Sequence, residues 1–149
     1  MTVRSRGKLM KAIDVERVKK AIQEAERQTS GEIRVSVSRY FWGPVRHVAE
    51  KAFGRLNMDR TKARNGVLFF IVPSRKRFVV LGDEGIHARV GQDFWDSLAS
   101  LLAGHFRKGE FTEGLVRAIG EAGAKLATHF PYDPATDVNE LSDDIDFGT

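Results

Sequence analysis

The stretch Asn65–Gly91, NGVLFFIVPSRKRFVVLGDEGIHARVG, decides the fold of this chain. Within it, Val67–Val72 is an unbroken apolar run closed by Pro73, which is typical of a strand buried on both faces. Phe78–Leu81 forms a second apolar run after a short polar segment. Because the connection is so short, the two strands are expected to pair antiparallel as a hairpin.

Towards the N-terminus, the sequence predicts a helix, a strand and a second helix. Asp14 can cap a helix that extends to about Gln28. Glu32–Ser38 alternates apolar and polar residues, which indicates a half-buried strand whose polar side chains face outward. Val45–Arg60 has helical periodicity. Since a strand, a helix and a strand form a right-handed crossover unit, Glu32–Ser38 is expected to lie parallel to Val67–Val72.

Towards the C-terminus, two more helices are expected. The first extends from about Gln92 to Arg107, and the second from about Thr112, a plausible cap, to Thr128. The predicted helices must cover both faces of one small sheet. The fold class is therefore α/β, a three-layer α/β/α sandwich around a small mixed β-sheet.

The two ends of the chain differ in charge from the domain between them. We divide the chain into a basic N-terminal arm over residues 1–13, one α/β/α domain over 14–131, and an acidic C-terminal tail over 132–149. A basic arm can favour nucleic acid or an anionic lipid surface, whereas solvated ends that offset each other need no partner. Because the chain carries no recognised nucleic-acid motif, we expect no nucleic-acid partner.

The composition is that of a soluble globular protein, with 42% hydrophobic and 30% charged residues among 149. The absence of cysteine excludes disulfides, thiolate metal sites and a cysteine nucleophile. Val67–Val72 is the longest apolar run and is too short to span a membrane. No apolar core follows the basic N-terminus, so we expect no signal peptide and no anchor. The expected location is cytoplasmic, at most peripheral to a membrane.

Polar residues after the hairpin are the best candidates for a metal site. Asp83, Glu84, His87 and Asp93 are the closest oxygen and nitrogen ligands in the sequence. Carboxylates suit the hard cations Ca²⁺ and Mg²⁺, and a strand end beside a helix start is a usual place for a site. The alternative is a solvated turn in which Asp93 stabilises the N-terminus of the following helix.

Two other segments have a structural and a functional interpretation. Tyr40, Phe41 and Trp42 form an aromatic loop that either caps the core or binds a partner. The hairpin tip, Arg75–Arg77, either grips a phosphate or protects an exposed sheet edge from aggregation.

Eight short segments occur in an order that is more specific than any one of them. They are Gly31–Val35, Arg64–Leu68, Gly82–Ile86, Val90–Gly91 with Phe94–Trp95, Phe106–Gly109 with Glu113–Leu115, and Asn139–Leu141. Over about residues 14–145 this order resembles the TPM domain family, which includes a thylakoid acid phosphatase. The similarity is greatest to the stand-alone members without a signal peptide or membrane helix.

The resemblance implies an α/β/α sandwich with a divalent-metal site, usually for Ca²⁺, in a groove at one end of the sheet. It also implies acid phosphatase activity for some members. By position, Asp93 matches an acidic residue of the family. His87 stands where many members have a carboxylate, and Arg64 stands where many have aspartate.

Two functions follow from the residues and the resemblance. The one we favour is a TPM-domain module that binds Ca²⁺ or Mg²⁺ and acts as an interaction or accessory protein. Its candidate partner is a membrane-anchored relative of the family. The alternative is a metal-dependent acid phosphatase, in which Asp93 holds the metal, Asp83 or Glu84 acts as the base, and Arg64 binds the phosphate.

Overall fold

A mixed sheet of three strands lies at the centre of the computed structural model, which describes residues 12–39, 43–135 and 141–148. The strands are β1 (Glu32–Val37), β2 (Gly66–Val72) and β3 (Arg77–Gly82), in the order β1-β2-β3. β1 pairs parallel with β2, and β3 pairs antiparallel with β2. Both predicted pairings are confirmed.

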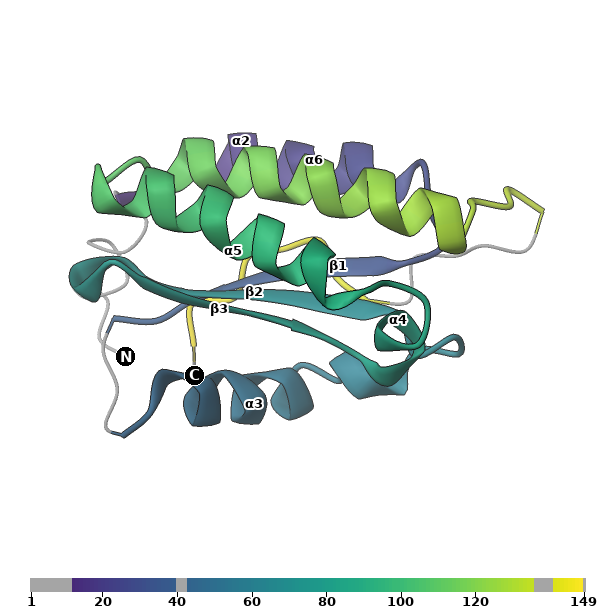
Figure 1. Cartoon of the computed structure of the whole chain (residues 1–149), viewed down its shortest axis with the longest axis horizontal. Coiled ribbons are helices and arrows are strands. Elements are labelled where there is room, and N and C mark those ends of the chain that lie inside the picture. The colour runs from purple at the N-terminus through teal and green to yellow at the C-terminus, as the bar shows by residue number, and fades with distance from the viewer. Residues whose placement is uncertain (1–11, 40–42, 136–140, 149) are drawn as a thin grey trace.

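Helices cover the two faces of this sheet (Figure 1). Three long helices lie on one face and one lies on the other, so the predicted three-layer α/β/α sandwich is confirmed. The upper layer in Figure 1 consists of α2 (Val15–Glu26), α5 (Gln92–Arg107) and α6 (Phe111–His129), and the lower layer is α3 (Val45–Arg55). None of the described helices combines the length and apolar composition needed to cross a membrane.

Strand β2 supplies side chains to two separate cores. Val67, Phe69 and Ile71 pack into the larger core beneath α2, α5 and α6. The alternate residues of β2 pack against α3 in the smaller core. Every residue of β2 is buried, as expected for an apolar run without alternation.

The C-terminal segment 141–148 changes the environment of β1. The backbone N–H of Val37 donates to the carbonyl of Asp146 (2.7 Å), and the N–H of Asp146 donates to the carbonyl of Val35 (2.9 Å). Ser36, predicted to face solvent, is only 2% exposed beside this segment, and its hydroxyl donates to the Asp146 carboxylate (2.7 Å). The prediction of a half-buried strand is therefore wrong at Ser36.

Two predicted helix ends also differ from the structure. The helix from Val45 ends at Arg55, because Asn57 adopts a left-handed conformation (φ 60°) before the short 3₁₀ helix Met58–Arg60. Thr112 does not cap α6; its hydroxyl accepts the backbone N–H of Asp14 (2.9 Å), just before α2. Short-range sequence patterns cannot reveal that long-range contact.

Candidate functional site

A short helix joins the sheet to α5 at the end of the molecule where β2 begins and β3 ends. This helix, α4 (Glu84–His87), lies at the right of Figure 1. Its N-cap is Asp83, whose carboxylate accepts the backbone N–H of Glu84 (2.8 Å). The N–H of Asp83 donates to the carbonyl of Gly66, the first residue of β2 (2.9 Å). The hairpin register therefore places Asp83 beside the loop that precedes β2.

Gly85 lets α4 approach this loop at backbone distance. Its N–H donates to the carbonyl of Arg64 (2.9 Å). A Cβ at Gly85 would lie 2.2 Å from the carbonyl oxygen of Ala63 and 2.6 Å from that of Arg64. Only glycine fits so close to another backbone without displacing it.

Arg64 binds the Asp83 carboxylate through two parallel hydrogen bonds. Its Nε donates to Oδ2 (2.7 Å) and its Nη2 donates to Oδ1 (3.0 Å). Its third nitrogen, Nη1, lies 3.3 Å from Oε1 of Glu84. Asp83 is only 7% exposed, whereas the Arg64 side chain is 41% exposed. The hydrogen bond to Asp83 raises the pKa of Arg64 further, so the guanidinium is permanently charged.

The other two predicted ligands lie outside this ion pair. The His87 ring packs on Trp95, with ring centroids 5.0 Å apart, and Trp95 also lies against Gly82. Asp93 is exposed in the first turn of α5, where a carboxylate interacts favourably with the helix dipole. The structure thus brings Asp83 and Glu84 together with Arg64.

The donor set does not fit a divalent cation as it stands. Both oxygens of Asp83 already accept hydrogen bonds from a guanidinium, and Glu84 lies beside the same positive charge. Among the residues that the structure describes, no three His, Asp or Glu side chains are arranged to hold a metal ion. In the structure, the positive charge beside these two carboxylates is the Arg64 side chain.

The sequence prediction missed the pairing of Arg64 with Asp83, although the hairpin contained a signal for it. An antiparallel pair with Val67 opposite Gly82 must bring the residues before β2 next to those after β3. We predicted the hairpin but not its register. Arg64 and Asp83, 19 positions apart, were therefore assigned separate roles.

Comparisons with known proteins agree on the kind of domain. The family model described as TPM domain matches residues 3–125. The chain is similar to the NMR structure of the BA42 protein from the psychrophilic bacterium Bizionia argentinensis, with a TM-score of 0.84 and 39% sequence identity. That similarity covers 91% of this chain and 95% of the BA42 chain. A comparison with curated proteins gives no match.

Proposed function

The chain belongs to the TPM domain family, and from this premise we propose that it is a non-catalytic interaction module in which Arg64 replaces the predicted Ca²⁺ or Mg²⁺. The observation that carries the proposal is the two-pronged bond from Arg64 to Asp83. A guanidinium matches the geometry of a carboxylate and supplies positive charge without a metal. The chain itself therefore supplies the counter-charge of the Asp83 carboxylate.

The phosphatase alternative requires the same groups in a different state. Arg64 would have to bind a phosphate, and Asp83 or Glu84 would have to accept a proton. In the structure, Arg64 contacts both carboxylates. The alternative therefore requires this ion pair to open before a substrate could bind. Because catalysis needs this additional step, we favour the interaction module.

The proposed partner is a protein, and a membrane-anchored relative of the family stays our candidate. Tyr40, Phe41 and Trp42, predicted either to cap the core or to bind a partner, lie outside the described residues. If this loop captures the partner, deleting residues 40–42 must abolish co-purification with it. Unchanged co-purification would exclude the aromatic loop as the contact.

A metal titration with two variants tests the proposal at Arg64. We would measure the melting temperature of the wild-type protein, Arg64→Ala and Arg60→Ala in metal-free buffer and with increasing Ca²⁺ or Mg²⁺. A cation that binds only the folded state would stabilise it by about 2.7 kcal/mol at 100 times its dissociation constant. We expect no shift for the wild type, and an upward shift for Arg64→Ala, whose carboxylates are left without their counter-ion.

The matched control is Arg60→Ala, because Arg60 is an exposed arginine of the preceding 3₁₀ helix. It loses the same charge but leaves the Asp83 carboxylate paired, so it should behave as the wild type. A cation-dependent shift in the wild type would overturn the proposal and restore the predicted metal site. Hydrolysis of p-nitrophenyl phosphate by the wild type, lost in Arg64→Ala, would instead favour the phosphatase.

A further inference from the structure

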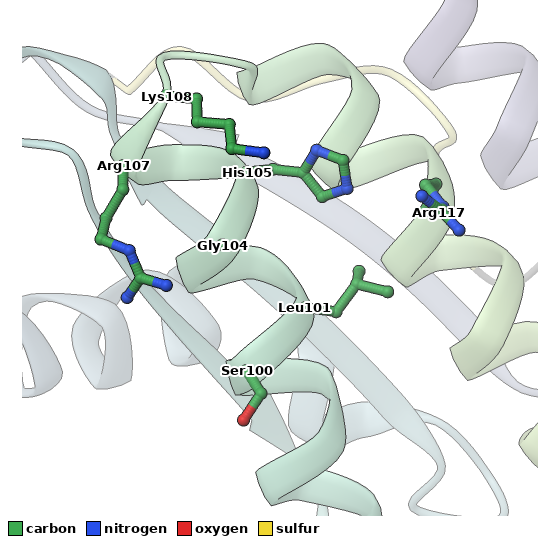
Figure 2. A pocket seen from close by; sticks show the side chains of 7 residues that line it. All are labelled: Ser100, Leu101, Gly104, His105, Arg107, Lys108 and Arg117. Carbon is green, nitrogen blue, oxygen red and sulfur yellow. The ribbon is translucent and has the colours of Figure 1, made fainter.

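A pocket of about 470 Å³ lies between α5 and α6, away from α4 along the length of α5 (Figures 1 and 2). It is lined by Ser100, Leu101, Gly104, His105, Arg107, Lys108 and Arg117. We call it the Gly104 pocket. None of its lining residues belongs to the Arg64–Asp83 cluster, and the predicted site does not use any of them.

One helical position that lines the hollow has no side chain. A Cβ built on Gly104 would meet no atom within 4 Å, so the space above this residue is open. Leu101, one turn earlier, is half-buried and gives the pocket an apolar side. Glycine in the middle of a helix costs about 1 kcal/mol relative to alanine, so the hollow is present at the expense of helix stability.

The charges around the hollow have one sign. Arg107, Lys108 and Arg117 are exposed cations, and none of the lining residues is a carboxylate. Figure 2 shows Lys108 and Arg117 on either side of His105, with Arg107 on the other side of Gly104. The nearby Glu110 is engaged, because its Oε1 lies 2.9 Å from Nδ1 of His105.

The end of α5 repels an anion less than an uncapped helix end would. Helix C-termini normally repel anions because their last carbonyls are unpaired. Here the N–H groups of Lys108 and Gly109 donate to the carbonyls of His105 and Phe106 (3.1 and 3.0 Å). Lys76 of the hairpin tip reaches the carbonyl of Arg107 (3.4 Å) and adds another cation to this end.

We propose that the Gly104 pocket binds an acidic segment of a partner protein. The inference rests on the proposed function, since it names the chemistry of the partner that an interaction module would recognise. Carboxylates of the segment would bind Lys108 and Arg117, and an apolar portion would lie against Leu101. The cations surround a compact hollow rather than forming a row, which suits a short peptide better than a nucleic-acid backbone.

The test is a fluorescence-anisotropy titration of the full-length protein with a fluorescein-labelled peptide of alternating Asp, Glu and Leu. The double variant Lys108→Ala/Arg117→Ala should weaken binding at least about tenfold, because each charge-assisted bond contributes substantially to affinity. The matched control, Lys20→Ala/Arg27→Ala, removes the same charge from exposed positions of α2 and its C-cap, and should change affinity less than about twofold.

Gly104→Leu distinguishes peptide binding inside the hollow from binding through surface charge alone. This variant fills the hollow without changing any charge, and leucine favours helix, so the protein should stay folded. It should weaken peptide binding as strongly as the double variant. Equal weakening in the α2 control, no effect of Gly104→Leu, or no wild-type binding at low salt would overturn the proposal.

Two competition arms identify other ligand sources. Displacement of the peptide by inorganic phosphate at micromolar concentration, or preferential binding to vesicles containing phosphatidylserine, would overturn the peptide as ligand. The metal titration at Arg64 reads a different part of the molecule, so failure of the peptide test leaves the proposed function standing.

Discussion

Asp83 has two roles that substitutions can separate. Its carboxylate caps α4 through the Glu84 N–H and also binds Arg64. Asp83→Ala removes both interactions, and we expect a loss of about 1–2 kcal/mol, mostly from the cap. The bond to Arg64 should add little, because that side chain is 41% exposed and water screens the pair. Urea denaturation followed by circular dichroism measures the loss.

Asp83→Asn is the matched variant for this prediction. Its amide oxygen can still accept the Glu84 N–H, but the negative charge that holds Arg64 is lost. We expect a smaller loss than for Asp83→Ala. If both variants lost the same stability, the ion pair rather than the cap would be the dominant interaction of Asp83.

The protonation of Glu26 should make the stability of the protein depend on pH. Burial, the hydrogen bond with Asp143 and the nearby Glu32 raise the pKa of Glu26 to about 10, against the opposing bond that its Oε2 accepts from the Ile33 N–H. The folded protein therefore holds a proton that the unfolded chain releases near pH 4.5. The contribution of this proton to the free energy of unfolding is fully present below pH 4.5. It is lost as the pH rises towards 10, because the free energy of unfolding falls by up to about 1.4 kcal/mol per pH unit.

Glu26→Gln should remove this pH dependence, because its amide mimics the protonated acid. The side-chain oxygen can accept the Ile33 N–H, and the NH₂ group can donate to Asp143. We expect the variant to unfold at higher urea concentration than the wild type at pH 8, and at a similar concentration at pH 4. Glu24→Gln, an exposed substitution on the same helix, is the control. Parallel pH profiles for Glu26→Gln and the wild type would contradict the prediction.

At the scale of the elements, α4 depends on one backbone approach. Gly85→Ala would push its Cβ into the carbonyl oxygens of Ala63 and Arg64, in the loop before β2. We expect a loss of about 1–3 kcal/mol from overpacking. A displacement of α4 would also move its N-cap, Asp83. The melting temperature of the variant should therefore be measured both without Ca²⁺ and with increasing Ca²⁺.

Gly120→Ala is the matched control for Gly85→Ala. Gly120 lies in α6, and a Cβ there would meet nothing within 4 Å. Alanine should therefore stabilise the helix by about 1 kcal/mol. Opposite signs for the two substitutions are expected, and a stabilising Gly85→Ala would show that α4 does not lie so close to the loop.

The strands were predictable from sequence because their signals are local. The apolar run Val67–Val72 does not alternate with polar residues, and the run Phe78–Leu81 is short. The hairpin could still be identified, because Pro73 and the polar tip separate the two runs. α5 was predicted with its observed bounds for a similar reason, since Gly91 and Gly109 flank an uninterrupted pattern. The early end of α3 was not predicted, because the residues around Asn57 do not indicate its left-handed conformation.

The candidate site was less predictable than the elements that carry it. The sequence identified Asp83 and Glu84 as residues of interest but grouped them with His87 and Asp93 by proximity along the chain. The structure groups them with Arg64 instead, since strand register and not sequence distance decides which side chains meet. The predicted Ca²⁺ or Mg²⁺ stays a prediction, and the cation titration of the wild-type protein tests it.

At the scale of the whole molecule, the C-terminal segment is part of the fold. Ile145 and Phe147 are buried in the larger core, and Asp146 is bound by both terminal nitrogens of Arg55 (3.1 and 2.8 Å). The acidic composition of the tail suggested a solvated segment. Its alternation of Ile145, Asp146 and Phe147 was the signal for an extended segment with one buried face.

Removing residues 141–149 should therefore expose the edge of β1 as well as core surface. The truncation deletes the two backbone hydrogen bonds to Val35 and Val37 and leaves Ser36 and Arg55 without Asp146. An open strand edge is a template for pairing with another chain. We expect the truncated protein to melt at lower temperature and to form dimers or larger species in sedimentation velocity.

Phe147→Ala distinguishes lost packing from the exposed edge. This substitution removes a buried ring and should cost about 3 kcal/mol, but it keeps the backbone bonds between Asp146 and β1. It should therefore lower the melting temperature without causing self-association. If Phe147→Ala associated as strongly as the truncation, general destabilisation would explain the effect. A truncated protein that stayed monomeric and as stable as the wild type would show that the segment does not protect β1.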